Sequence, residues 1–146
     1  MADKTFGAPI GGVDYIERRC AYGVILNEQN QVALARCNGV YFLPGGGIEG
    51  VESPQDCITR ECIEELALDV TVTDFIYNGD LYSQSAKTGK HYHSIGQFYI
   101  TEFIKQLDQP SEEDHVLVWM DAEEAVSKLQ LASQAWAVSE ALKMKK

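Results

Sequence analysis

The stretch that decides the fold runs from Leu43 to Leu68 and reads LPGGGIEGVESPQDCITRECIEELAL. Its proline and three glycines predict an irregular backbone at the start. Ser53 and Pro54 then predict the beginning of a helix, because serine can cap a helix and proline suits its first turn. Asp56 completes a capping-box pattern. The helix is expected to run to about Leu66, or two residues beyond it.

Three glutamates share one face of this predicted helix. A rotation of about 100° per residue places Glu61, Glu64 and Glu65 within an arc of about 100°. Clustered carboxylates repel one another and therefore call for a compensating cation. Carboxylates on a rigid helix suit Mg²⁺ or Mn²⁺. The adjoining face is apolar and suited to the core, with Ile58, Cys62 and Leu66.

Three other interpretations of this stretch are weaker. A solvated acidic helix explains neither the glycines nor the spacing of the charges. A P-loop is excluded because no GK[ST] follows the glycines. A dinucleotide-binding fingerprint is also absent, because Gly45, Gly46 and Gly47 are not followed by the further glycine that it requires.

The spacing resembles the Nudix box. It reads Gly46, five residues, Glu52, seven residues, and then RECIEELAL over Arg60–Leu68. Two positions depart from the family pattern: Cys62 stands where a large aliphatic residue is usual, and Ala67 replaces the glycine that ends the helix. Alanine adopts the left-handed conformation less readily than glycine. The helix is therefore expected to run slightly longer or to end with strain.

The resemblance implies a loop and helix that hold a divalent metal ion, Mg²⁺ or Mn²⁺, beside the pyrophosphate of the substrate. Arg60 and Glu52 resemble the pair that braces the loop against the helix; the alternative is an ordinary surface ion pair. The implied metal ligands are the carboxylates of Glu61, Glu64 and Glu65 and a backbone carbonyl at Gly45 or Gly46.

The general base differs among members of this family. It can be the first glutamate of the box helix, here Glu61, or a glutamate on a distant loop. The segment Ser111–Trp119 resembles the family's acidic stretch ahead of a late tryptophan. Within it Glu113 is the first candidate and Glu112 the second, and a solvated acidic turn is the alternative.

Short apolar runs outside the box predict strands. A hairpin is expected around the polar turn 27–31, and a second turn at 87–90 is expected to pair the strand 91–103 with the segment near Leu81. Helices are expected from Asp121 and over 133–144. This order, with the resemblance, predicts a single domain over residues 1–146 of the α/β (α+β) class, a Nudix-type α/β/α sandwich with a mixed β-sheet. The predicted strands are 20–26, 32–36, 70–77, 91–103 and 116–120.

Composition narrows the possible partners. The formal net charge of −10 argues against binding to nucleic-acid polymers, whereas a small nucleotide remains compatible if metal ions neutralise its phosphates. The first residues lack the apolar core of a secretion signal, and no run reaches the length of a membrane span. The four cysteines form no CxxC pair, so a cytoplasmic protein with reduced thiols is expected. The expected oligomeric state is a monomer or a homodimer. Cys57 and Cys62 are expected in the core.

Two further pairs lie outside the box. Arg18 and Arg19 begin a strand and could reach substrate phosphates. His91 and His93 alternate and so share one strand face, for which an exposed surface is favoured over a ligand pair.

Three hypotheses for function follow. The leading one is a hydrolase that splits the phosphate anhydride of a nucleoside triphosphate, including an oxidised one, or of a sugar nucleotide. The second is a dinucleoside polyphosphate or ADP-ribose hydrolase. The third is a nucleotide-binding sensor without turnover, against which the complete set Glu61, Glu64 and Glu65 argues.

Overall fold

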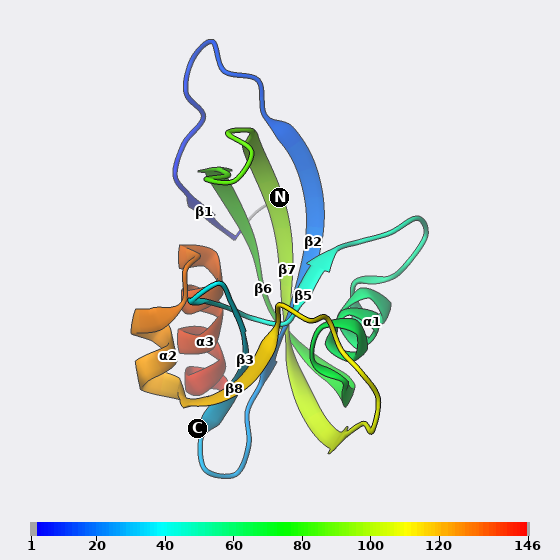
Figure 1. The fold of residues 1–146 in the computed structure, drawn as a ribbon. Coiled ribbons are helices and arrows are strands. Elements are labelled where there is room, and N and C mark those ends of the chain that lie inside the picture. Colours follow the sequence, from blue (N-terminus) through cyan, green and yellow to red (C-terminus); the bar gives the residue numbers. More distant parts are fainter. Residues whose placement is uncertain (1–2, 146) are drawn as a thin grey trace.

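Two β-sheets lie between helices in the computed structural model, which describes residues 3–145 (Figure 1). The larger sheet has the order β1 (Lys4–Phe6), β6 (Leu68–Gln84), β7 (His91–Gln106), β2 (Ile16–Ile25) and β5 (Gly45–Gly47). The smaller has the order β4 (Val40–Phe42), β3 (Gln31–Cys37) and β8 (Val116–Asp121). In the larger sheet β2 runs parallel to β7, whereas β6 and β7 are antiparallel. The predicted mixed sheet is therefore confirmed, although the strands divide between two sheets.

The helices cover opposite sides of these sheets. Helix α1 (Pro54–Leu66) lies on one side, and α2 (Ala122–Lys128) and α3 (Ala132–Met144) lie on the other (Figure 1). The predicted α/β/α sandwich is confirmed. Among the residues that the structure describes, no helix is long and apolar enough to cross a membrane.

The apolar face predicted for α1 forms its contact with the sheets. Ile58, Cys62 and Leu66 are buried in one core cluster, together with Ala21 and Ile25 of β2. Burial of this face fixes the rotation of the helix, so that Glu61 and Glu65 on the adjoining face lie next to the glycines of β5. Cys57 also lies in this cluster, which confirms the prediction that both helix cysteines are core residues.

The predicted hairpin between β2 and β3 is wrong beyond its turn. Asn27 donates its backbone N–H to Gln31 at 3.0 Å, and Leu26 bridges Val32, but the two strands then enter different sheets. Val32–Ala35 is buried at every residue, because both faces of β3 are covered. A strand buried on both faces carries no alternation that names its partner. The second hairpin is confirmed, with Leu81 opposite Ser94.

The glycines Gly45–Gly47 form strand β5, which corrects the prediction of an irregular backbone at these residues. They pair antiparallel with residues 20–22 of β2. At Gly45, with φ +147°, a Cβ atom would lie 2.2 Å from the carbonyl oxygen of Ala21. The glycines therefore permit the close approach of two strands. In the sequence alone, such a run of glycines looks like a loop.

Candidate active site

Helix α1 is delimited by its own sequence at both ends. Ser53 accepts the N–H of Asp56 on its Oγ at 3.0 Å, as its capping position predicts. At the other end Ala67 has φ 53° and ψ 42°, a left-handed conformation that alanine tolerates poorly. The helix thus ends where the family's glycine would end it, with strain, and does not run longer. Glu61, Glu64 and Glu65 occupy its last two turns.

Arg60 lies at the centre of the carboxylates of the box. Its Nε and Nη2 atoms donate to the two oxygens of Glu52 at 2.7 and 3.0 Å, a bidentate pair. Nη1 donates to Glu61 at 2.6 Å and to Glu64 at 3.2 Å, and Nη2 also reaches the carbonyl of Gly47 at 3.2 Å. This single guanidinium connects the loop to the helix in the way expected of Arg60 and Glu52.

Acid should weaken this brace in a defined pH range. Hydrogen bonds from Arg60 lower the pKa of Glu52 from 4.5 to about 2. A carboxyl whose folded pKa is depressed adds stability above its unfolded pKa, and that stability is lost as the pH falls from about 4.5 toward 2. We therefore expect wild type to be more stable than Glu52→Gln at pH 7 and the difference to shrink between pH 4.5 and 3. Urea unfolding of both proteins measures it.

Glu28→Gln, in the exposed turn between β2 and β3, is the control for that experiment and should follow wild type at every pH. A stability difference between wild type and Glu52→Gln that stays constant from pH 7 to 3 would contradict a contribution of the ionised pair.

Glu65 is the buried carboxylate of the site, with only 7% of its surface exposed. Its Oε1 accepts the backbone N–H of Gly45 at 2.8 Å, and its Oε2 lies 3.4 Å from Nε2 of His115. The pKa of Glu65 is raised from 4.5 to about 8, chiefly by burial; the hydrogen bond from Gly45 lowers the pKa, and the charges of Glu61, Glu112 and Glu64 raise it. A nearby cation would favour the ionised form of Glu65.

Glu61 and Glu64 extend the cluster toward solvent. The side chain of Glu61 is 17% exposed and burial raises its pKa, whereas that of Glu64 is 50% exposed. A Cβ atom on Gly46 would lie 2.6 Å from Oε2 of Glu61, so the glycine brings the backbone of β5 next to this carboxylate. The backbone of Gly45 and Gly46 thus lies next to Glu65 and Glu61.

The loop between β7 and β8 adds residues from a distant part of the chain. Gln106, the last residue of β7, donates to the carbonyls of Leu66 and Ala67 at 3.0 and 3.1 Å, and the backbone N–H of Glu112 in the loop donates to the backbone carbonyl of Glu64 at 3.0 Å. These bonds hold the loop against the end of α1. Ligand atoms of Glu65, Glu112 and His115 consequently lie within 4.8 Å of one another, a group that could hold a metal ion.

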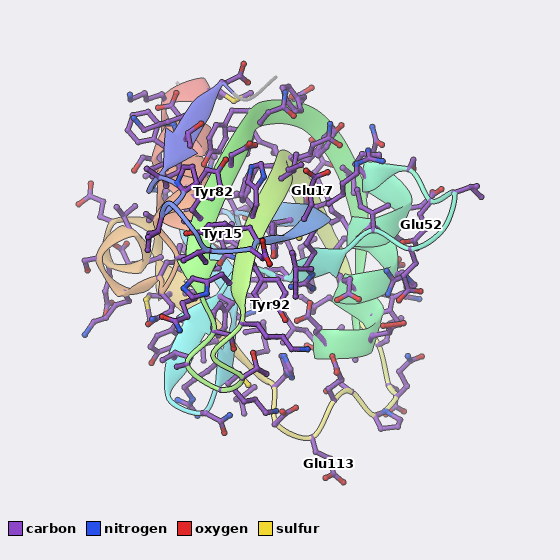
Figure 2. The ribbon with its side chains drawn as sticks, turned by 90° about the horizontal axis from the view of Figure 1, so that it is seen from above. Tyr15, Glu17, Glu52, Tyr82, Tyr92 and Glu113 are labelled. Atoms are coloured by element: carbon purple, nitrogen blue, oxygen red, sulfur yellow. The ribbon has the colours of Figure 1, made fainter. Side chains whose placement is uncertain are left out.

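The structure places the two loop candidates differently. Both glutamates are exposed, but Glu112 lies close to Glu65 and His115, whereas the side chain of Glu113 points away from α1 (Figure 2). This placement favours Glu112 over Glu113, and the role of either residue as general base stays a prediction. Sequence reasoning did not single out His115, although its position three residues after Glu112 in the acidic stretch could have drawn attention to it.

A cavity of about 430 Å³ adjoins the carboxylates. Glu61 and Gly47 line it on the side of the box, and Arg18 and Arg19 line it from β2. The two arginines thus line the same cavity as Glu61. The cavity thus has acidic groups, from Glu17, Glu49 and Glu61, as well as two guanidinium groups, a mixture that suits a polyphosphate that carries divalent cations.

Comparisons with known proteins agree with this geometry. A family model described as NUDIX domain matches residues 17–142. The fold is similar to that of a NUDIX hydrolase from Nitrosomonas europaea, with a TM-score of 0.73 and 15% identity over 90% of this chain and 92% of that one. It is also similar to a MutT protein from Methanosarcina mazei (TM-score 0.70, 20% identity, 92% and 100% covered) and to an ADP-ribose pyrophosphatase from Streptococcus suis (0.62, 21%, 85% and 90%).

The family match spans most of the chain and includes the whole box helix with its three glutamates. Members of this family are hydrolases of nucleoside-diphosphate-linked compounds and generally use divalent metal ions. The chain belongs to the NUDIX domain family and is a Nudix hydrolase.

Proposed function

We propose that this enzyme is a pyrophosphohydrolase that uses Mg²⁺ or Mn²⁺ to split a phosphate anhydride in a nucleoside triphosphate or a sugar nucleotide. The residues of the structure would form one catalytic domain, since the family match extends from β2 into α3.

One observation carries this proposal: a buried carboxylate, Glu65, lies among three others. Its pKa is raised to about 8 by burial and by Glu61, Glu112 and Glu64, while its partners are a backbone N–H and a histidine. Such an arrangement opposes folding in the ionised form. A divalent cation offsets both the burial and the repulsion, so the residues fit the metal that the family uses.

We assign the metal ligands to Glu61, Glu64 and Glu65, with a carbonyl of Gly45 or Gly46. Glu52 and Arg60 act by position: their bidentate pair holds the loop 48–53 against α1 and orients Glu61 through its contact with Nη1 of Arg60. Glu112 is the preferred general base, because it joins Glu65 from outside the helix. Glu61 is the alternative base.

The reaction needs one water molecule and one anhydride. The water oxygen attacks a phosphorus atom, the P–O bond of the anhydride breaks, and the departing phosphate keeps the electron pair of that bond. The proton of the water moves to a carboxylate oxygen of the base. Bound metal ions supply neutralisation of the phosphate oxygens. Arg18 and Arg19 would orient the remaining phosphates in the cavity that they line together with Glu61.

The test is a panel of nucleotides with and without Mg²⁺ or Mn²⁺, with products identified by chromatography. We expect metal-dependent release of a nucleoside monophosphate, or its counterpart, from at least one nucleoside triphosphate or sugar nucleotide. ADP-ribose and dinucleoside polyphosphates belong in the same panel, because preferred turnover of either would replace the proposed substrate class. Binding of nucleotides without turnover of any compound would contradict the catalytic proposal and favour a sensor.

A further inference from the structure

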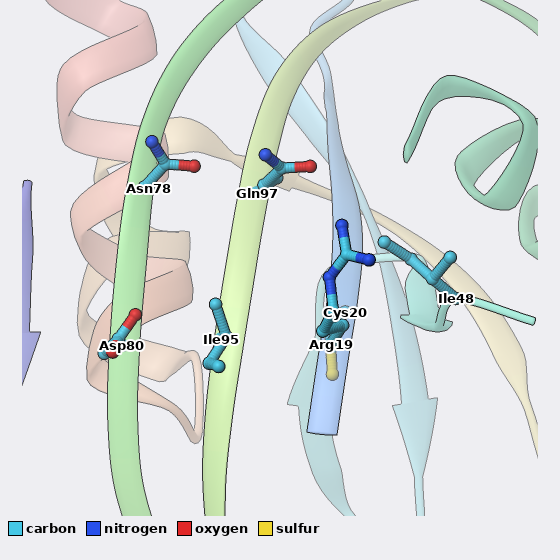
Figure 3. Close-up of a pocket in the computed structure, with 7 residues that line it drawn as sticks. All are labelled: Arg19, Cys20, Ile48, Asn78, Asp80, Ile95 and Gln97. Atoms are coloured by element: carbon cyan, nitrogen blue, oxygen red, sulfur yellow. The ribbon is translucent and has the colours of Figure 1, made fainter. Parts of the chain in front are cut away.

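A second cavity lies next to the first and farther from the carboxylates. It has a volume of about 280 Å³ and shares Arg19 and Ile48 with the cavity that contains Glu61 (Figure 3). Small-molecule pockets typically have volumes of roughly 300–1,000 Å³, so this one suits a single ring system rather than a whole nucleotide. A nucleotide whose phosphates lie beside Glu61 would place its base here.

The polar lining of this cavity is built by the sheet. Asn78 of β6 and Gln97 of β7 are register partners, so both side chains stand on the same face of the sheet. Asp80 is opposite Ile95 in the next pair on that face, and Arg19 of β2 is opposite Ile95 on its other side. Figure 3 shows the two carboxamides side by side above Asp80 and Ile95.

One atom of this lining lacks a partner. Oε1 of Gln97 is buried, and it is the only buried side-chain nitrogen or oxygen among residues 3–145 that makes no hydrogen bond. Buried acceptors are normally satisfied by the protein, by an ordered water or by a ligand, and Gln97 lines the cavity, so this exception points to a group that the cavity admits. The missing group must be a hydrogen-bond donor, because a carboxamide oxygen only accepts.

The carboxylate of Asp80 provides a second hydrogen-bond acceptor in the lining of this cavity. Its Oδ2 lies 2.8 Å from Nε2 of His93, and the ring of His93 stacks on Tyr82 with centroids 4.3 Å apart and an interplanar angle of 7°. His93 is thus half-buried and bonded, which corrects the expectation of an exposed face. Its contact fixes the Asp80 carboxylate and leaves Oδ1 without a hydrogen bond to the described residues.

We propose that this cavity binds the nucleobase of the substrate and selects bases with an exocyclic amino group, an inference that rests on the function proposed above. Gln97 Oε1 and Asp80 offer acceptors to the N–H groups of cytosine, guanine or adenine. Uracil and thymine present a carbonyl oxygen where cytosine has its amino group, and hypoxanthine has a carbonyl oxygen where adenine has its amino group and a hydrogen atom where guanine has one. At that position these bases offer the acceptors an oxygen or no donor, which is unfavourable. Gln97 and Asp80 are therefore specificity-determining residues.

Matched nucleotide pairs test this selection. CTP carries an exocyclic amino group where UTP carries an oxo group, and GTP carries an amino group that ITP lacks. We expect kcat/KM with Mg²⁺ or Mn²⁺ to favour CTP over UTP and GTP over ITP by at least about tenfold in one pair, the discrimination expected from about 1.4 kcal/mol. Calorimetry with α,β-methylene analogues of the same four nucleotides measures the preference in binding, independently of turnover.

Variants at position 97 identify the responsible atom. Gln97→Leu removes the acceptor and should reduce the preference to below about threefold, chiefly by raising KM for the amino-bearing nucleotide. In Gln97→Glu the ionised carboxylate still accepts hydrogen bonds at this position, so the preference for amino-bearing nucleotides should be retained. Gln29→Leu, in the exposed turn between β2 and β3, is the matched control and should behave as wild type. Melting temperatures of all variants verify that they are folded.

Specific results would overturn the inference. Equal kcat/KM and equal binding within both pairs in wild type would show that the cavity does not select amino groups. A full preference that persists in Gln97→Leu would show that an ordered water satisfies Oε1. Either result can occur while hydrolysis continues, so the proposed function would stand. Preferential binding of the amino-bearing analogues without any turnover would instead support the base site and contradict the proposed function.

Discussion

Replacing Glu65 with glutamine is expected to lower turnover by at least about a hundredfold, about 2.7 kcal/mol of barrier, without lowering the melting temperature of the metal-free protein. Glutamine has nearly the same shape, and its carbonyl oxygen can still accept the N–H of Gly45, which bonds Oε1 of Glu65 at 2.8 Å. The charge that would bind a metal ion is lost. Excess Mn²⁺ is expected to restore part of the activity.

The stability part of this prediction depends on pH. The pKa of Glu65 is raised from 4.5 to about 8 in the folded protein, chiefly by burial. A carboxyl with a raised folded pKa opposes folding once the unfolded chain ionises, so metal-free wild type should lose stability as the pH rises from about 4.5 to 8. Glu65→Gln lacks this loss. The difference in melting temperature should therefore favour the variant increasingly across this range.

Melting curves in the presence of a chelator and turnover across a metal titration measure the two parts separately. Glu124→Gln is the matched control, because this exposed glutamate lies on α2, on the opposite side of the sheets from α1. Ala67→Gly restores the usual helix end and should change activity little. Full turnover of Glu65→Gln at low metal concentration would remove α1 from the metal site.

The helix of the box could be predicted from sequence because local rules determine it. Ser53 and Pro54 define its beginning, the apolar positions define its rotation, and the spacing of the glutamates follows from that rotation. Even the unusual end was foreseeable as one of two outcomes. In the structure the helix ends at Ala67 with a strained backbone, and the N–H of Ala67 donates to the carbonyl of Ile63 at 3.0 Å. Gln106 of β7 donates to the carbonyls of Leu66 and Ala67 at this end of the helix.

The glycine strand was not predictable in the same way. Gly45–Gly47 lacks the side chains that identify a strand, and the reason for the glycines is the approach of β2, more than twenty residues earlier in the chain. The cavity at Asn78 and Gln97 depends likewise on the register between β6 and β7, which shifts at three points between Asp69 and Tyr77. Local patterns do not encode such shifts.

The β7–β8 loop shows the same limit at the scale of one residue. Sequence identified the acidic stretch but gave no reason to prefer Glu112 over Glu113, since neighbouring loop residues point in directions that only the backbone defines. The bond from the N–H of Glu112 to the carbonyl of Glu64 sets that direction. It brings Glu112 and His115 to Glu65, whereas Glu113 does not belong to this group.

The pair Glu112→Gln and Glu113→Gln turns this difference into a kinetic prediction. We expect Glu112→Gln to lower kcat by at least about tenfold, about 1.4 kcal/mol of barrier, because an amide cannot take the proton of the attacking water. Both variants keep the backbone bond to Glu64, and Glu113→Gln is therefore a matched control that should keep wild-type kinetics. Steady-state rates at saturating metal, with melting temperatures for both variants, measure the effect. A loss of kcat in Glu113→Gln alone would mean that the loop changes its conformation when substrate binds. Wild-type rates in both variants would assign the general base to Glu61 on α1.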